Sequence, residues 1–240
     1  MTEHIVRAFE EELVSLGEKI AQMGGIVEGQ LAEAVDALKR RDAELAQKVI
    51  SDDKTADTFE QAIEEQAILM IVRRQPMALD LREIMAAIRV SAELERIGDL
   101  AKNVAKRVLA IGTEVQPKRL IHGVEHMSRM AMEQLKNVLD SYSQRDAEKA
   151  LAVWRRDEEV DSMYTSLFRE LLTYMMEDPR NITACTHLLF AAKNIERIGD
   201  HTTNIAEMVY YLVHGEALTD QRPKGDETST TAVPYPVSEE

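Results

Sequence analysis

Acidic side chains recur in this 240-residue chain in pairs that stand four residues apart. Glu95 and Asp99 enclose the string Glu-Arg-Ile-Gly-Asp, and the same five letters return at Glu196 and Asp200. A second kind of pair, Asp-x-x-x-Asp, also occurs once in each half. Side chains at this spacing share one face of a helix, so each pair presents two carboxylates together. The eight residues are Asp53, Asp57, Glu95, Asp99, Asp157, Asp161, Glu196 and Asp200.

These carboxylates predict a metal site in each half of the chain. Two like charges at this spacing oppose helix formation by roughly 0.2–0.5 kcal/mol per pair, and their presence in both halves favours compensation by a cation. Oxygen-only ligands suit Mg²⁺, Mn²⁺ or iron better than Zn²⁺, which prefers histidine and thiolate. The simpler alternative is that the acids are solvated and that the motif persists because Gly98 and Gly199 let helices approach closely.

The repeat extends beyond the acids and sets the organisation of the chain. Asn103 corresponds to Asn204 and Pro76 to Pro179, at offsets that drift by only a few residues. Ala, Leu, Glu, Lys and Met are abundant, and no alternating apolar run indicates a strand. We therefore expect an all-α fold of two tandem antiparallel three-helix bundles related by internal duplication. The bundles span residues 1–112 and 113–215, and residues 216–240 are predicted to form a disordered acidic tail.

Caps and prolines predict where the helices begin and end. Asp42, Asp80 and Asp146 are expected N-caps, and Gly112 is expected to end the third helix. The predicted helices cover about 3–40, 42–74 and 80–111 in the first half, and about 118–143, from 146 onward, and 181–214 in the second.

The helical hairpins bring the acidic pairs of each half to the same height. A turn near Met77 sets Asp57 level with Ile97, since each lies 20 residues from the turn. In the second half, a turn near Pro179 sets Asp161 level with Arg197. Glu95 and Asp99 lie nearly opposite the apolar seam of their own helix. We therefore expect any site that they form to be on the surface.

Composition excludes several classes of function. The net charge is −14, from 43 acidic and 29 basic side chains, which disfavours binding to nucleic acid. Cys185 is the single cysteine, so no intramolecular disulfide is possible. No apolar run approaches the roughly 20 residues that span a bilayer, and no basic amphipathic helix favours direct membrane binding. The chain is expected to be soluble and cytoplasmic.

Two histidine patterns are weaker metal signals. The string from His122 to His126 matches H-x-x-E-H, but it has no counterpart in the other half and is best explained by chance. His201 follows Asp200, yet its counterpart is Leu100, so we expect an exposed neighbour of the acids rather than a ligand.

Taken together, the motifs resemble the PhoU family of phosphate-specific transport system accessory proteins. The resemblance spans about residues 5–215 and rests on motifs at matched spacing in both halves. The motifs are the two Glu-Arg-Ile-Gly-Asp strings, each with an Asn four residues on, Met23-Gly24-Gly25, Arg74-Gln75-Pro76, and Thr173-Tyr174-Met175-Met176-Glu177-Asp178. The resemblance implies a six-helix homodimer with metal at the eight acids above.

The resemblance also implies a function. A member of this family is a negative regulator of the phosphate-starvation response and is not an enzyme. It couples the ATPase subunit of a phosphate ABC transporter to a sensor histidine kinase, and it is peripheral to the inner membrane through these partners. The tail matches nothing specific.

Two other classes of function remain open at this point. A metal-free helical adaptor needs only exposed helix faces and would leave the acids to meet basic partner surfaces. A carboxylate-bridged dimetal enzyme would need Glu-x-x-His pairs that project into the bundle. None of the six histidines has Glu three residues before it, and the acids are expected to face outward, which disfavours the enzyme.

Overall fold

The computed structural model describes residues 2–112, 118–220, 222, 225 and 228. These residues are almost entirely helical, with no strand in the described part of the chain. The elements are α1 (Thr2–Arg40), α2 (Ala43–Asp52), α3 (Lys54–Arg74), α4 (Leu79–Ile111), α5 (Lys118–Gln144), α6 (Ala147–Arg155), α7 (Asp157–Glu177), the 3₁₀ turn η1 (Pro179–Asn181) and α8 (Ile182–His214).

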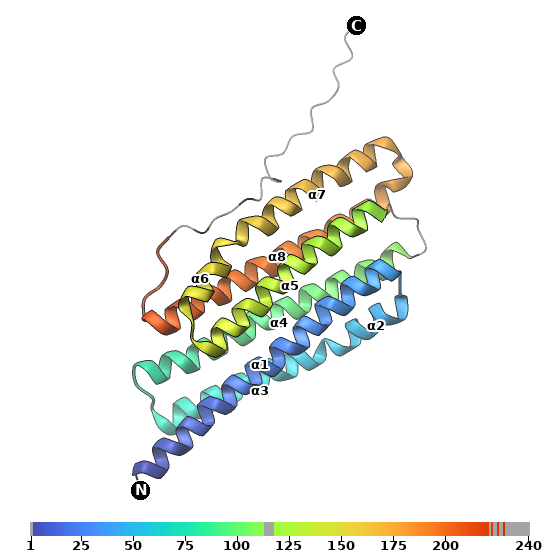
Figure 1. Cartoon of the computed structure of the whole chain (residues 1–240). Helices are drawn as coiled ribbons and strands as arrows, with labels where there is room; N and C mark the ends of the chain where they lie inside the picture. The colour runs from blue at the N-terminus through green and yellow to red at the C-terminus, as the bar shows by residue number, and fades with distance from the viewer. Residues whose placement is uncertain (1, 113–117, 221, 223–224, 226–227, 229–240) are drawn as a thin grey trace.

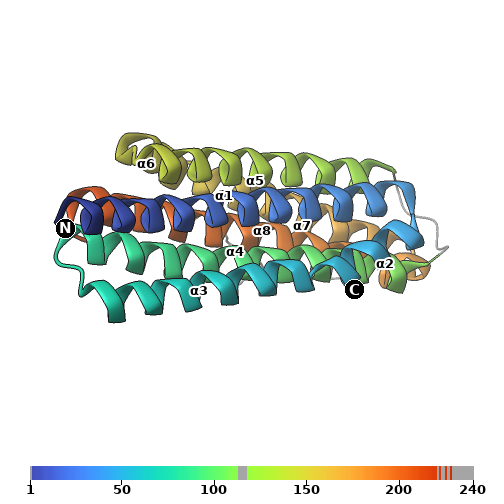
Figure 2. The same cartoon turned by 90° about the horizontal axis from the view of Figure 1, so that it is seen from below.

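The helices form two bundles that lie side by side. In one, α1 and the α2–α3 segment pack on α4; in the other, α5 and the α6–α7 segment pack on α8 (Figure 1). The bundles join mainly where α4 lies along α8, and α1 also contacts α5. The long helices run roughly along one direction, as the second view shows (Figure 2). The prediction of an all-α fold with two tandem bundles is confirmed.

An apolar seam along each central helix holds its bundle together. In α4 the side chains of Val90, Leu94 and Ile97 are fully buried. Their counterparts in α8 include Ile195 and Ile198, which are equally buried. Helices in such a bundle owe most of their stability to this burial rather than to intrinsic propensity.

The predicted caps hold at the same point of each half. The Asp42 carboxylate accepts a hydrogen bond from Leu45 N at 2.9 Å, and that of Asp146 accepts one from Lys149 N at 3.0 Å. Gly112, with φ at 58°, ends α4 as expected. The prediction for Asp80 is wrong. The chain re-enters the helix at Leu79, so Asp80 lies inside the first turn of α4.

The second helix of each half is broken, against the prediction of one continuous helix from Asp42 to about residue 74. The first break falls at Asp53, between α2 and α3, and the second at Arg156, between α6 and α7. In the second half, the side-chain amide of Gln134 donates to the backbone oxygen of Arg156 at 2.9 Å. The same oxygen also accepts from the backbone N of Glu159 at 3.1 Å. Each break places an aspartate, Asp53 or Asp157, at the start of a new helix.

Parts of the predicted domain division lie outside the described residues. Residues 113–117 span the expected boundary between the bundles, and residues 221, 223–224, 226–227 and 229–240 belong to the predicted tail. The domain limits and the disorder of the tail therefore stay predictions.

Candidate functional site

The acidic residues are more buried than the sequence indicated. Asp53, Asp157, Asp161 and Glu196 are only 5%, 1%, 4% and 4% exposed, so the prediction of a surface site is wrong for them. The reason is tertiary. The central helices α4 and α8 are packed on several sides, and the segments that carry Asp53, Asp157 and Asp161 pack on these helices. The remaining four acids, Asp57, Glu95, Asp99 and Asp200, are partly buried.

In the first half, a lysine joins two of the predicted ligands. Lys102 Nζ lies 2.5 Å from Asp53 Oδ2 and 2.5 Å from Asp99 Oδ1. Burial alone would lower the pKa of Lys102, but these two hydrogen bonds outweigh it and raise that pKa. The ammonium therefore neutralises carboxylates from two chain segments, the α2–α3 break and α4.

The other first-half acids lie on the adjoining faces of α3 and α4. Burial, followed by the charges of Asp99 and Glu60, raises the pKa of Glu95. Burial also raises the pKa of Glu60, with Glu64 and Asp57 contributing. Glu60 is thus a further acid of this cluster that sequence reasoning missed. Its position three residues after Asp57, on the same helix face, was the available signal.

A buried glutamine lies beside this cluster. A Cβ atom added to Gly98 would come 3.0 Å from Gln30 Oε1 and 3.8 Å from Asp53 Oδ1, so both side chains adjoin the same glycine. Gln30 is 6% exposed, and neither its Oε1 nor its Nε2 has a hydrogen-bond partner among the described residues. Buried amides are normally bonded, so this one indicates a place for a further polar group. Close helix approach at Gly98, the simpler explanation of the motif, is also observed.

In the second half, the equivalent aspartates are joined by an arginine from beyond α8. Arg222 Nε lies 2.7 Å from Asp157 Oδ2, and its Nη2 lies 2.6 Å from Asp200 Oδ1. Thr203 Oγ1 also donates to Asp157 Oδ1 at 2.9 Å. Asp161 Oδ2 accepts from the backbone N of Gly225 at 2.9 Å. Sequence reasoning assigned no role to Arg222, and no local pattern pointed to it.

Burial perturbs the Glu196 carboxyl of the second cluster strongly. Burial raises its pKa to about 7, against the opposing effect of Lys193, whose Nζ lies 2.9 Å from Glu196 Oε2. The charges of Asp200 and Asp161 add to the increase. The two clusters therefore hold equivalent acids in different electrostatic surroundings.

A polar contact between the halves involves a residue next to the second cluster. Glu93 Oε2 on α4 lies 2.6 Å from His201 Nδ1 and accepts from Asn204 Nδ2 at 3.1 Å, both on α8. His201 is therefore bonded across the bundles and mostly buried, and the expectation that it is exposed is wrong. In the H-x-x-E-H string, Glu125 pairs with Lys39 at 2.9 Å, which is a structural role.

The donor set of each cluster fits a hard cation in chemistry, but positive side chains already take up its oxygens. Among the residues that the structure describes, no three His, Cys, Asp or Glu side chains are grouped so that they could hold a metal ion. Lys102 and Arg222 each draw two carboxylates onto themselves instead. Oxygen-only ligands and an unbonded buried amide are what Mg²⁺, Mn²⁺ or iron would use. Binding would require these cationic groups to move aside.

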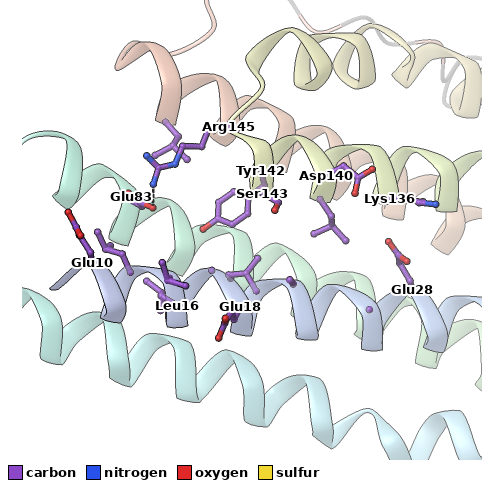
Figure 3. A pocket seen from close by; sticks show the side chains of 18 residues that line it. Glu10, Leu16, Glu18, Glu28, Glu83, Lys136, Asp140, Tyr142, Ser143 and Arg145 are labelled. Atoms are coloured by element: carbon purple, nitrogen blue, oxygen red, sulfur yellow. Dashed lines mark hydrogen bonds and ion pairs between the residues drawn. The ribbon is translucent and has the colours of Figure 1, made fainter. Parts of the chain in front are cut away.

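A large cleft lies elsewhere, between α1 and α5. It has a volume of about 840 Å³ and is lined by apolar and charged side chains. Figure 3 shows Glu28 facing Lys136 and Asp140 at one end, and Arg145 beside Glu83 at the other. The described residues that line it include no His or Cys. This cleft therefore offers no metal site with His or Cys ligands and no nucleophile–base pair that uses His or Cys.

Replacing Lys102 by glutamine is expected to destabilise the metal-free protein by about 2 kcal/mol. The change leaves Asp53 buried without its cation. Removing one partner of a fully buried pair costs about 3–5 kcal/mol, and the partial exposure of Asp99 reduces this cost. Urea unfolding with a chelator present measures the difference.

Lys106→Gln is the matched control for this substitution. Lys106 lies on the exposed side of the same helix, where its Nζ is 3.4 Å from Asn103 Oδ1. We expect its stability to stay within about 0.5 kcal/mol of wild type. If both variants unfold at the same urea concentration, Lys102 does not neutralise the cluster in the way described.

Comparison with known proteins places the chain in a family. The PhoU domain model matches residues 20–108 and again residues 124–209, so each half of the chain contains one copy. The chain belongs to the PhoU family. A PhoU homolog of Rhizobium meliloti strain 1021, named a phosphate-specific transport system accessory protein, is 59% identical over 95% of this chain and 96% of its own length. The PhoU protein of Escherichia coli K12 is 39% identical over 90% of this chain and 89% of its own length.

Solved structures of PhoU proteins have the same fold. The crystal structure of PhoU from Pseudomonas aeruginosa matches with a TM-score of 0.83 and 40% identity, over 87% of this chain and all of that one. The crystal structure of the phosphate transport system regulatory protein PhoU from Streptococcus pneumoniae matches with a TM-score of 0.81 and 27% identity. The match covers 88% of this chain and 99% of that one. In the described part of the present chain, no helix is long and apolar enough to cross a membrane.

Proposed function

We propose that this protein is a cytoplasmic negative regulator of the phosphate-starvation response and of phosphate uptake. It couples the ATPase subunit of a phosphate ABC transporter to a sensor histidine kinase, and it reaches the inner membrane through these partners. The observation that carries the proposal is the match of both halves to the PhoU domain, together with high identity to phosphate transport accessory proteins over nearly the whole chain.

The protein acts by contact, without turnover of a substrate. Long helices offer extended faces for partner proteins, and we expect a homodimer as the working unit. With phosphate plentiful, the bound protein holds the kinase in its phosphatase-favouring state.

The two acidic clusters serve this role as cation sites. Asp53, Asp57, Glu95 and Asp99 would hold a cation in the first half, with Glu60 beside them. The equivalent ligands in the second half are Asp157, Asp161, Glu196 and Asp200. When bound, Mg²⁺, Mn²⁺ or iron would join the helices that carry these acids and so fix the helix face that a partner meets. Support comes from the oxygen-only donor set and from the positive groups that the clusters already attract.

A metal-free adaptor is the second candidate, and one observation favours it. Lys102 and Arg222 already neutralise two carboxylates each, so the clusters are partly compensated by the chain itself. In that case the acids hold chain segments together through ion pairs with Lys102 and Arg222 and bind no metal. The dimetal enzyme has less support, because no histidine has Glu three residues before it, although four of the acids are buried.

Retention by the partners tests the proposal. The tagged ATPase subunit and the cytoplasmic part of the kinase are immobilised in the presence of Mn²⁺. Wild type is expected to be retained. We call the combination Glu95→Gln, Asp99→Asn, Glu196→Gln and Asp200→Asn the four-amide variant, and we expect its affinity to be about tenfold lower, or about 1.4 kcal/mol. Arg180→Gln, a change at an exposed ion pair, is the control and should bind as wild type does.

The outcomes separate the candidates. If the four-amide variant binds as well as wild type, the adaptor stands without metal. If neither partner retains the wild-type protein, the regulatory assignment is contradicted.

A further inference from the structure

Arg222, in the segment that follows α8, is built into the second acidic cluster. Its Nε and Nη2 lie 2.7 Å and 3.0 Å from the two oxygens of Asp157, and Nη2 also lies 2.6 Å from Asp200 Oδ1. The Arg222 side chain is only 18% exposed in this position. A paired, forked contact of this kind is specific and stronger than a surface ion pair. One guanidinium thus joins carboxylates from α7 and α8.

The first cluster has the same arrangement, but its cation comes from a different place. Lys102 contacts Asp53 and Asp99, which are the repeat equivalents of Asp157 and Asp200. The repeat equivalent of Lys102 itself is Thr203, which is uncharged. The second half therefore lacks a cation within α8 at this position. Arg222 supplies from outside the repeat what Lys102 supplies from inside it.

Two hydrogen bonds and one apolar contact also hold the same segment in place. Gly225 N donates to Asp161 Oδ2 at 2.9 Å, and Thr165 Oγ1 donates to the oxygen of Gly225 at 3.4 Å. A Cβ atom added at position 225 would lie 3.0 Å from a side-chain carbon of Glu158, so glycine permits this close approach. Leu218 packs against the hydrophobic core.

We propose that this segment is a removable counter-ion for the second acidic cluster. We call it the strap and define it by its described anchors Leu218, Arg222 and Gly225. With the strap docked, Arg222 occupies Asp157 and Asp200; with the strap released, these carboxylates are open to a divalent cation. The first cluster differs, because Lys102 belongs to α4 and is not part of the strap. The inference rests on the proposed use of the clusters as cation sites.

The physical basis is competition for the same oxygens. A cation and the guanidinium cannot both use Asp157 and Asp200. The apparent affinity for the cation is therefore the intrinsic affinity multiplied by the fraction of molecules with the strap released. Anything that binds the strap elsewhere, such as an acidic surface of a partner that pairs with Arg222, would raise the cation affinity of the second cluster. The halves would then respond differently to one partner.

Trypsin reports on the docked strap without any metal. The peptide bond after Lys224 lies between Arg222 and Gly225, and mass spectrometry identifies its cleavage. With a chelator present, we expect Arg222→Gln to be cut there about tenfold faster than wild type, because cleavage follows the population of the open form. Arg180→Gln removes an exposed arginine and should leave this rate unchanged. Asp157→Asn with Asp200→Asn should speed cleavage as Arg222→Gln does.

Calorimetry with Mn²⁺ then measures the competition. We expect Arg222→Gln to bind Mn²⁺ at the second cluster with about tenfold higher affinity than wild type, and Mn²⁺ to speed cleavage after Lys224 in the wild-type protein. If no variant binds Mn²⁺, the cation sites themselves are wrong. If Mn²⁺ binds but Arg222→Gln changes neither affinity nor cleavage, the sites stand and the strap is overturned.

Discussion

The wild-type protein is expected to bind metal in both halves, and the four-amide variant is expected to bind none. Its substitutions at Glu95, Asp99, Glu196 and Asp200 keep side-chain size but remove four negative charges, and hard cations depend on charged oxygen ligands. Helicity should stay nearly unchanged. Elemental analysis of protein purified without chelator or metal affinity resin measures the effect.

Glu125→Gln serves as the control for this experiment. Glu125 lies in the H-x-x-E-H string on α5. It forms an ion pair with Lys39 and belongs to neither acidic cluster. Its loss should leave the metal content unchanged. Equal metal in wild type and the four-amide variant would show that the clusters are not the ligands.

Glu196→Gln is expected to remove a large pH dependence of stability in the chelated protein. Burial raises the pKa of Glu196 from 4.5 in the unfolded chain to about 7 in the fold. Between these values the folded state binds more protons, so the free energy of unfolding falls as pH rises. The stabilisation is fully present below pH 4.5 and is lost as pH passes 7, a difference of about 3 kcal/mol.

Urea unfolding at pH 5 and at pH 8 measures this difference. Glutamine copies the neutral form of the side chain, so the variant should gain about 2.5 kcal/mol relative to wild type between the two pH values. Glu177→Gln changes an exposed residue and is the control. Its free energy of unfolding should differ from that of wild type by the same amount at both pH values. A Glu196→Gln protein that keeps the wild-type pH profile would show that Glu196 ionises in the fold as it does in water.

Sequence predicted the features that depend on local chemistry. Asp42 and Asp146 cap helices because their carboxylates reach backbone N–H groups three residues ahead, and Gly112 ends α4 because it adopts a positive φ. The seam through Leu94 and Ile97 follows from helical spacing alone. These rules act over a few residues and can be read from any one chain.

Most of the features that sequence missed depend on contacts between distant segments. No proline or glycine marks the breaks at Asp53 and Arg156. Asp53, Asp157 and Asp161 are buried where the α2–α3 and α6–α7 segments pack on α4 and α8, and a single-helix projection cannot show such packing. Arg222 lies 65 residues from Asp157, so spacing gives no sign of their ion pair.

A phosphate-starvation reporter gene, measured at high phosphate in a strain that lacks this protein, tests most directly whether the protein is a negative regulator. We predict that the reporter is expressed as strongly as in starved wild-type cells, and that the wild-type gene on a plasmid restores repression. We also expect the four-amide variant to fail in this rescue if cations serve the regulation. A reporter that stays repressed at high phosphate in the absence of the protein would contradict the regulatory assignment.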